Sequence, residues 1–404
     1  MAQPRRDARL TAALAVVAAA QWLGTSLWFS PAGAAQGLMQ RWELGAPQFA
    51  WLIAATQLGF IAGSIALAAT GAADRWAASR LFALSCVAGA ALNALVMLPG
   101  LGYGAAWGLR AAVGVTLAGI YPLGMKMVVQ WVGGKPALAL AWLVGMLTLG
   151  TAMPHALRAV GVAWPWQAVL AGSSLMALAG GVMVWCVGDG PHRPAPAAGA
   201  RFGFDWGALS ALARVPAFRA SALGYFGHMW ELYAFWSVVP LLCAAVLAGG
   251  ARQGAAWGWL PAIVIGVGSL GCVVGGMLAR RWGSAAVAAV ALAGSGLVCA
   301  VYPLLPGDAV LARCALLATW GVLVVADSPQ FSAMSAQAAP AQGLGVALVL
   351  QNGLGFLVSA VSIVLLGWAL AAWGDKALWL LLPGPILGLW AMRAQWRALT
   401  FQQR

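Results

Sequence analysis

The sequence is short of charged residues. Asp, Glu, Lys and Arg together make up 8% of its 404 residues, whereas about a quarter of a typical soluble domain is charged. Hydrophobic residues make up 63%. A chain of this composition cannot cover its surface with polar side chains. An ordinary soluble domain is therefore excluded, and an integral membrane protein is indicated.

The sequence also lacks the short motifs of several protein classes. It has no GxxxxGK[ST] loop of ATP-driven motors, no HExxH zinc motif and no nucleophile elbow. The cysteines lack the paired spacing of a zinc or redox site, and all six fall in apolar stretches: Cys86, Cys186, Cys243, Cys272, Cys299 and Cys314. We therefore expect no enzyme, no metal site and no cofactor. The remaining energy source is an ion gradient across the membrane, and intramembrane acidic and histidine side chains favour protons.

Long apolar stretches recur along the whole chain. A helix of about 20 residues crosses a hydrocarbon core of ~30 Å, and a helix satisfies its own backbone hydrogen bonds in lipid. No alternating pattern of a barrel is present. We expect an all-α membrane protein with twelve transmembrane helices, at about residues 9–33, 48–70, 80–99, 104–131, 136–157, 164–187, 217–245, 254–279, 284–305, 309–335, 343–368 and 377–394.

The basic residues predict the orientation of these helices. An even number of spans places both termini on one side. If that side is the cytoplasm, fifteen Lys and Arg lie at inner ends and loops, and five lie outside: Arg41, Arg158, Arg252, Arg313 and Lys376. Because Lys and Arg are enriched in cytoplasmic loops, we expect cytoplasmic termini in a multi-pass protein of the cell inner membrane. The net charge of +13 then reflects topology and attraction to anionic lipid, not a nucleic-acid partner.

The chain divides into two halves of six spans. A stretch rich in Pro, Gly and Arg, residues 189–216, predicts a cytoplasmic linker between bundles at 1–188 and 217–404. AADRW at 72–76 matches LARRW at 278–282, and Pro122 and Pro329 occupy equivalent places in the fourth span of each half. Both matches have nearly the same offset, which indicates an internal duplication. Each proline removes one backbone hydrogen bond and should bend its span.

This organisation resembles the major facilitator superfamily. TGAADRWAASR at 70–80 is similar to the Gly-x-x-x-Asp-Arg loop of that family, although Thr70 replaces its first glycine and its central Gly-Arg is missing. RAAVG at 110–114 resembles the Arg-x-x-x-Gly pattern of the fourth span, and GMLTLGTAMP at 145–154 resembles the glycine and proline signature of many exporters. There is also a faint similarity to the nitrate/cyanate permease-like branch, without its paired Gly/Asn-rich signatures. The resemblance implies a secondary transporter whose two halves rock about a midplane site.

Three titratable residues lie inside the seventh and tenth spans. Glu231 lies near the middle of its span, Asp327 lies two residues before Pro329, and His228 shares a helix face with Glu231. A buried carboxyl and a buried imidazole both favour their neutral forms, which suits groups that take up and release protons. We therefore expect Glu231, Asp327 and His228 to couple transport to protons. The alternative is that His228 and Glu231 only hold helices together by hydrogen bonds.

Two basic residues, Arg110 and Lys126, lie in the fourth span. Arg110 stays charged and must meet an anion, a carbonyl or water, whereas Lys126 either faces the cavity or extends to the membrane surface. Aromatic and amide side chains at similar depth extend the expected substrate site, which comprises Arg110, Lys126, Tyr121, Tyr225, Trp22, Trp28, Trp230, Trp236, Gln351 and Asn352.

The resemblance also implies gating residues. Asp74, Arg75 and Arg80 belong to the basic loop, which should clasp the halves together on the cytoplasmic side, while Pro122 and Pro329 should allow the fourth spans to bend.

The charges predict a monomeric, proton-coupled transporter of a small organic anion or zwitterion that works by alternating access. The partners are then the substrate, protons and the lipid bilayer. A broad-specificity, proton-coupled exporter of lipophilic or cationic compounds is the alternative, because Glu231, Asp327 and an aromatic cavity would suit it as well. The sequence does not decide between them.

Overall fold

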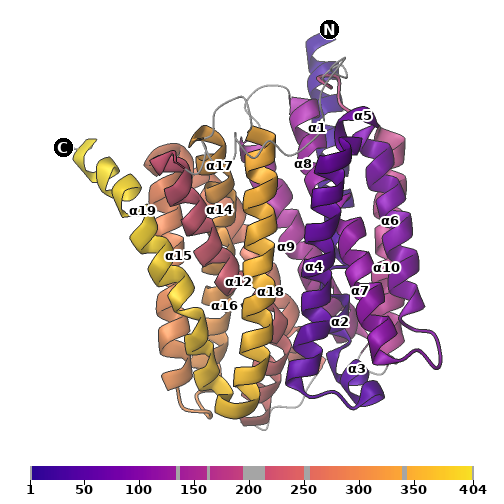
Figure 1. Ribbon diagram of the computed structural model, residues 1–404, viewed down its shortest axis with the longest axis vertical. Helices are drawn as coiled ribbons and strands as arrows, with labels where there is room; N and C mark the ends of the chain where they lie inside the picture. Colours follow the sequence, from indigo (N-terminus) through magenta and orange to yellow (C-terminus); the bar gives the residue numbers. More distant parts are fainter. Residues whose placement is uncertain are drawn as a thin grey trace.

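A computed structural model of the chain describes residues 2–132, 137–161, 164–193, 214–249, 255–338 and 344–402. Every element in these ranges is a helix, and the long helices run side by side (Figure 1). The N-terminal half contains α1 (Ala2–Thr25), α2 (Ser30–Gly33), α3 (Ala35–Trp42), α4 (Ala46–Thr70), α5 (Ala72–Arg75), α6 (Ala78–Leu95), α7 (Tyr103–Ala118), α8 (Tyr121–Val132), α9 (Ala137–Val160) and α10 (Trp166–Val187).

The C-terminal half repeats the arrangement of long helices with short 3-10 turns between them. Its elements are α12 (Pro216–Gly249), η1 (Ala255–Trp259), α13 (Leu260–Gly266), α14 (Gly268–Trp282), α15 (Ser284–Val301), η2 (Tyr302–Leu304), α16 (Val310–Ala326), α17 (Ser328–Ala338), α18 (Leu344–Trp373), η3 (Gly374–Leu381) and α19 (Pro383–Gln402). Of the predicted linker, residues 194–213 lie outside the described ranges.

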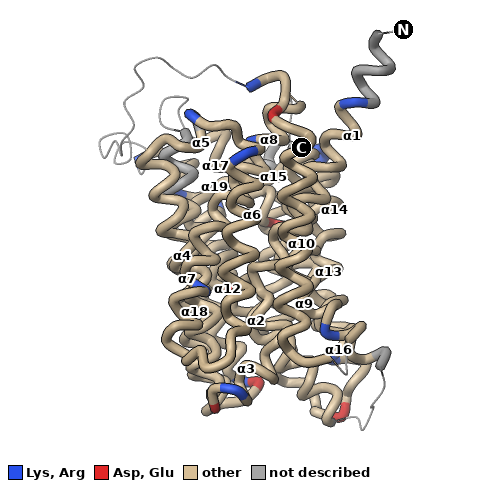
Figure 2. Tube along the Cα trace, turned by 90° about the vertical axis from the view of Figure 1, so that its right-hand side faces the viewer, with Lys and Arg blue, Asp and Glu red and all other residues tan. Residues whose placement is uncertain are grey.

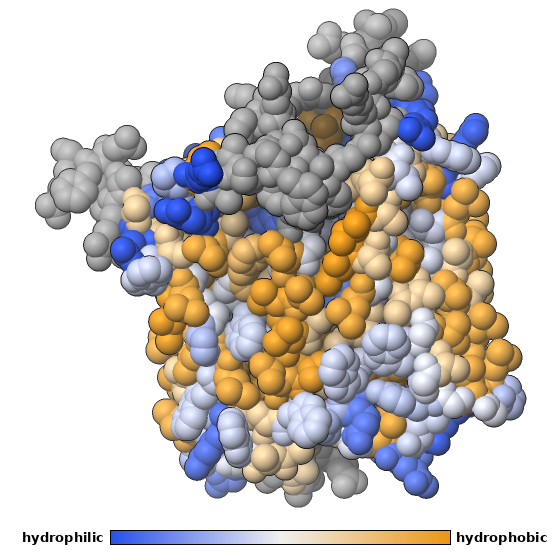
Figure 3. Space-filling model, viewed as in Figure 1, coloured by the Kyte–Doolittle hydropathy of each residue, from blue (hydrophilic) through white to orange (hydrophobic). Residues whose placement is uncertain are grey.

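The helices account for the predicted spans. Among the described residues, ten stretches are long and apolar enough to cross a membrane. The stretch at 351–395 runs through both α18 and α19, and α1 is not among the ten. With α1 added and α18 counted apart from α19, the helices follow the order of the twelve predicted spans. Apolar residues form a belt around the middle of the molecule in Figure 3, with more hydrophilic residues above and below it.

Both ends of the bundle lie at one face of the molecule. The start of α1 and the end of α19 lie at the top in Figure 1. We call this the linker face, because α10 also ends there, and we call the other end the opposite face. Lys and Arg occur near both faces, as Figure 2 shows, and few lie between them.

Both fourth spans are broken at their prolines, as predicted. α7 ends at Ala118 and α8 begins at Tyr121, with Pro122 as its second residue; α16 ends at Ala326 and α17 begins at Ser328, with Pro329 as its second residue. Proline fits the first turn of a helix, where the missing N–H would have no partner in any case. Each fourth span is therefore two helices joined at mid-depth.

The first span differs from the single helix expected over 9–33, because α1 ends at Thr25. The Thr25 hydroxyl donates to the Gln21 carbonyl at 2.8 Å, and the Ser26 hydroxyl donates to the Leu23 carbonyl at 2.6 Å. Such bonds compete with the helical backbone pattern. The chain then turns through Trp28 and Phe29 before α2 begins, which brings both rings into the interior.

Glycines bring α4 and α7 into direct backbone contact. A Cβ on Gly59 would overlap the Ala111 carbonyl oxygen, and a Cβ on Gly114 would overlap the Thr56 carbonyl oxygen. Small residues allow membrane helices to approach this closely. This pair of helices fixes the position of Arg110, which lies on α7 beside the contact.

The two halves meet mainly where α4 packs on α18 and where α9 packs on both α13 and α14. A Cβ on Gly276 of α14 would lie 2.9 Å from the Ala141 methyl group near the linker face, and a Cβ on Gly266 of α13 would lie 3.6 Å from the Ala152 methyl group nearer the opposite face. The two halves are therefore in close contact along α9.

Candidate functional site

A small cavity lies between the halves at mid-depth. Its volume is about 30 Å³, enough for one or two water molecules. The wall is aromatic and apolar with a few hydroxyl and amide groups, and is formed by Tyr121, Met125, Val144, Leu147, Tyr225, Met229, Leu232, Tyr233, Trp236, Val325, Ser328, Ser332, Asn352 and Phe356. No Lys or Arg is among these described wall residues.

Aromatic rings join the two halves beside the cavity. We call this group the aromatic seam; it consists of Trp28, Phe29, Phe60 and Tyr121 from the N-terminal half and Tyr233, Trp236 and Phe356 from the C-terminal half. The Trp28 ring stacks on Phe356 with centroids 5.4 Å apart, and Phe60 lies 4.3 Å from Phe356. Phe29 lies 6.1 Å from Tyr233. These pairs cross between the halves and must separate if the halves move apart there.

Glu231 is buried inside the C-terminal half, with no exposed surface. Its carboxylate accepts hydrogen bonds from the Ser295 hydroxyl on α15 at 2.8 Å and from the Trp320 indole N–H on α16 at 2.7 Å. Phe235 stacks on the Trp320 ring at 4.4 Å and holds the indole in place. Both donors are neutral, so no basic side chain is hydrogen-bonded to this carboxylate among the described residues.

His228 pairs with Asp327 across two helices. The distance from His228 Nδ1 to Asp327 Oδ1 is 2.8 Å, and both side chains are 1% exposed. Asp327 lies at the break between α16 and α17, where its own carbonyl accepts from the Phe331 backbone N–H at 3.0 Å. In such a buried pair either partner can hold the proton.

The sequence therefore located the titratable residues but not their pairing. His228 and Glu231 share α12 as predicted, yet they contact different neighbours: His228 meets Asp327, and Glu231 meets Ser295 and Trp320. Both do link α12 to neighbouring helices. Their assignment as proton carriers remains a prediction.

Arg110 occupies a site of a different kind. Its guanidinium donates to the Asn93 side-chain oxygen at 2.8 Å, to the Thr56 hydroxyl at 3.0 Å and to the Ser30 hydroxyl at 3.4 Å. It also donates to two main-chain carbonyls, those of Leu27 and Trp28, at 2.9 and 2.8 Å. Neutral oxygens from α2, α4, α6 and the turn between α1 and α2 thus surround the charge, and Arg110 does not line the cavity. The geometry fits a structural hydrogen-bond centre better than the expected substrate ligand.

Lys126 extends towards the linker face. Its ammonium group donates to the Ala73 carbonyl on α5 at 2.5 Å, so the side chain joins the broken fourth span to the loop between α4 and α6. It is not part of the cavity wall. This position fits the expectation that the Lys126 side chain extends to the membrane surface. It fits the expectation of a substrate ligand less well.

The predicted aromatic and amide residues separate into two groups. Tyr121, Tyr225, Trp236 and Asn352 line the cavity, and Trp28 lies beside it in the seam. Trp22, Trp230 and Gln351 do not line it. Trp230 instead donates its indole N–H to the Leu380 carbonyl at 2.8 Å and borders an apolar groove between α12, α18 and α19.

The predicted gating loop makes contacts within the N-terminal half. The Arg80 guanidinium lies 6.0 Å from the Trp185 ring of α10, and Arg75 is exposed. The backbone of Asp74 lies in α5, but its side chain is outside the described part of the chain. The clasp between halves remains a prediction for all three residues.

Four residues of functional interest were missed or undervalued. Ser295 and Trp320 contact Glu231, and Tyr233 and Phe356 line the cavity. A serine or an aromatic residue in an apolar span gives no signal of its own. Only the spacing of Tyr233, three residues before the predicted Trp236 on the same span, could have indicated that the two rings share a helix face.

The comparisons with known proteins agree with the fold. The sequence matches the family model of the Major Facilitator Superfamily over residues 12–363. None of the curated proteins matches the chain. A solved structure described as a bacterial homolog of the human lysosomal transporter Spinster, in an inward-facing and unoccupied conformation, has a TM-score of 0.65 with 14% sequence identity. The alignment covers 98% of this chain and 96% of that one.

The fold and the buried site between two six-helix halves define a multi-pass secondary transporter, a class of membrane carriers and not of enzymes. The chain belongs to the major facilitator superfamily. The fainter similarity to the nitrate/cyanate permease-like branch remains an expectation.

Proposed function

We propose that this protein is a proton-coupled exporter that exchanges protons for lipophilic, cationic compounds. The observation that carries the proposal is the composition of the cavity. Its described wall contains aromatic rings and hydroxyl groups without Lys or Arg, and two buried carboxyl groups, Glu231 and Asp327, lie in the half that supplies most of the wall.

Aromatic faces and carboxylates both attract cations. A cation placed over Trp or Tyr gains about 0.5–2 kcal/mol, most when it is desolvated. Four rings of the wall are suitable: Tyr121, Tyr225, Tyr233 and Trp236. Met125 and Met229 add soft, adaptable surface, which suits cargo of variable shape.

The carboxyl groups explain why the exchange would be coupled. Glu231 and Asp327 do not line the described cavity wall, so they would attract a cation through the low-dielectric protein and not by contact. Protonation of Glu231 removes that attraction, so proton and cargo oppose each other. Binding of one favours release of the other. With the inward proton gradient expected at a cell inner membrane, such competition drives the cargo outwards. The His228–Asp327 pair offers a second place for the proton.

The competing reading, uptake of a small organic anion or zwitterion with protons, lacks a cation on the described cavity wall. Arg110 would have to leave five oxygen partners to reach an anion. Lys126 would have to leave the Ala73 carbonyl. Losing several charge-assisted hydrogen bonds costs about 1.5–3 kcal/mol each, which weighs against this reading.

The two readings predict opposite proton movements. Proteoliposomes containing a pH-sensitive dye would receive external ethidium or external benzenesulfonate. If cations are exchanged for protons, ethidium makes the interior alkaline. If anions enter with protons, benzenesulfonate makes it acidic. Both signals are measured against vesicles that contain the Glu231→Gln variant, and acidification by benzenesulfonate alone would overturn the proposal.

A further inference from the structure

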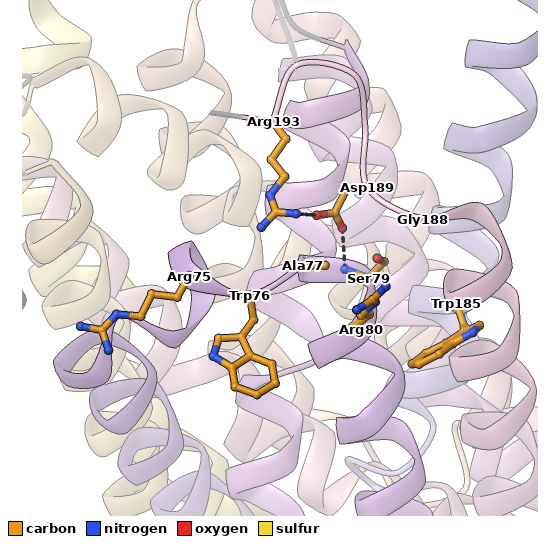
Figure 4. A pocket seen from close by; sticks show the side chains of 9 residues that line it. All are labelled: Arg75, Trp76, Ala77, Ser79, Arg80, Trp185, Gly188, Asp189 and Arg193. Carbon is orange, nitrogen blue, oxygen red and sulfur yellow. Dashed lines mark hydrogen bonds and ion pairs between the residues drawn. The ribbon is translucent and has the colours of Figure 1, made fainter. Parts of the chain in front are cut away.

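A second site lies at the linker face, away from the cavity. It is a groove of about 650 Å³ between α5, the start of α6 and the end of α10. Its walls include Arg75, Arg80 and Arg193, two tryptophans, Trp76 and Trp185, and Asp189 (Figure 4). The volume is in the range of pockets that hold small ligands.

The Asp189 carboxylate is bound by three groups of the protein. Its carboxylate accepts from the backbone N–H groups of Ala78 and Ser79, at 3.2 and 2.8 Å, in the first turn of α6. The same carboxylate pairs with Arg193 at 3.1 Å. Gly188 turns the chain with a φ of 73°, a value that favours glycine, and so places Asp189 against α6. Among the described wall residues, Asp189 is therefore paired with Arg193, and Arg75 and Arg80 are the two further arginines.

Arg80 provides the cation that faces the groove. In Figure 4 its guanidinium lies beside Ser79 and on the side of Trp185, and its distance to that ring is 6.0 Å. The side chain is exposed. Arginine presents planar pairs of donors that match a phosphate group.

The tryptophans place the groove at the boundary between lipid and water. Trp76 is 60% exposed and Trp185 is 58% exposed. Tryptophan is enriched at the level of the lipid headgroups, where one end of its ring is apolar and the other is wet. Arginines beside such rings lie at the depth of phospholipid phosphates.

A groove at the opposite face provides an internal comparison. It has a similar volume, about 560 Å³, and also contains two tryptophans, Trp373 and Trp379, but Lys376 is its only basic residue among those described. Both grooves therefore contain the tryptophans expected at a membrane boundary, and these rings do not distinguish the two grooves. The arginines distinguish the groove at the linker face.

We propose that the groove lined by Arg75, Arg80, Arg193, Trp76 and Trp185 binds the phosphate headgroup of an anionic phospholipid from the leaflet at the linker face. The bound lipid tightens the packing of α5 and α6 on α10. Because Lys126 bonds to the Ala73 carbonyl in the same loop, the lipid also stabilises the position of the broken fourth span.

The test is a titration of the purified full-length protein with dioleoyl phosphatidylglycerol, followed by native mass spectrometry and thermal unfolding. Dioleoyl phosphatidylcholine, with the same acyl chains, and glycerol phosphate, with no acyl chain, serve as comparison ligands. We expect phosphatidylglycerol to bind and to raise the unfolding temperature more than either. Equal effects of the two lipids would overturn the proposal, and binding of glycerol phosphate as tight as that of phosphatidylglycerol would replace the lipid by a soluble phosphate.

Arg80→Gln should weaken phosphatidylglycerol binding by about tenfold, the equivalent of one lost charge-assisted hydrogen bond. Arg193→Gln is the second variant if Arg80→Gln does not fold. The matched control is Lys376→Gln in the groove at the opposite face, which should leave binding unchanged. If Lys376→Gln weakens binding as much as Arg80→Gln, general surface charge is responsible and the site is wrong.

Discussion

The two halves of the protein treat buried charge in opposite ways. The N-terminal half buries Arg110, a permanent cation, among neutral oxygens of Asn93, Thr56 and two carbonyls. The C-terminal half buries Glu231, which can lose its charge by binding a proton, between Ser295 and Trp320. A charge that cannot change suits a fixed frame, whereas a charge that can change suits a switch. We therefore expect Arg110 to stabilise the N-terminal half, and we place the proposed proton coupling in the C-terminal half.

The largest expected effect is on stability and comes from Arg110 in the N-terminal half. Arg110→Gln leaves several buried oxygens without a donor, and each unsatisfied group costs about 1–3 kcal/mol. We expect the free energy of unfolding in mixed detergent micelles to fall by about 3 kcal/mol or more. Arg158→Gln, which removes an exposed arginine that donates to the Trp164 carbonyl, should cost under about 1 kcal/mol. An Arg110→Gln protein as stable as the unchanged protein would mean that Arg110 is not structural.

Coupling should be lost by a change in the other half. A one-to-one exchange of a proton for a monovalent cation moves no net charge, so the pH difference drives it and the membrane potential does not. One pH unit supplies about 1.36 kcal/mol, which sustains a cargo ratio of about tenfold. Glu231→Gln removes the titratable group, so we expect the ratio across the membrane to fall to about one. Exchange of labelled for unlabelled cargo at equal concentrations should survive. Accumulation that persists in Glu231→Gln would assign coupling to the His228–Asp327 pair.

A smaller change should weaken the proposed proton coupling at Glu231 without removing it. Ser295→Ala deletes one of the two donors to the Glu231 carboxylate, worth about 1.5 kcal/mol or roughly tenfold. We expect proton-driven transport to slow by about that factor in proteoliposomes. Ser237→Ala is the control, because the Ser237 hydroxyl bonds only to the Ala234 carbonyl of its own helix among described partners. Equal losses in both variants would show that Ser295 acts through general packing.

The smallest expected effect concerns the contact between the halves. An aromatic pair contributes about 0.5–1.5 kcal/mol beyond its buried area, and Trp28 stacks on Phe356 across the seam. Trp28→Ala should therefore favour opening towards the opposite face. A cysteine introduced by Asn352→Cys in the cavity wall should then react about fivefold faster with a maleimide. Trp142→Ala, which removes a tryptophan that is 48% exposed, should leave the rate unchanged.

The sequence predicted the fold because long apolar runs and repeated prolines are local signals. Pro122 and Pro329 marked the breaks in both fourth spans, and an acid in an apolar run is easy to see at Glu231 and Asp327. The hydrogen-bond partners of the buried charged side chains were harder to predict. Arg110 on α7 is bound by residues from α2, α4, α6 and the turn after α1, and no single stretch of sequence shows that these meet. Ser295 and Trp320 were missed because neither residue type is unusual in a span.

Asp189 is an acid whose role the sequence reasoning did not identify. It follows α10 and accepts from backbone N–H groups in the first turn of α6. The sequence VGDG after the sixth span contained a usable signal, because a glycine before an acid at the end of a helix commonly reverses the chain.

The glycine contact between α4 and α7 should keep the distance between these two helices constant, so this distance can serve as a reference in spin-label experiments. No side chain separates the two backbones at Gly59 and Gly114, so the pair has nothing to repack and cannot slide. Paired spin labels on α4 and α7 should report one narrow distance in every state of the transport cycle. Labels on α9 and α14 belong to different halves, and their distance can be read against that constant reference as the protein works.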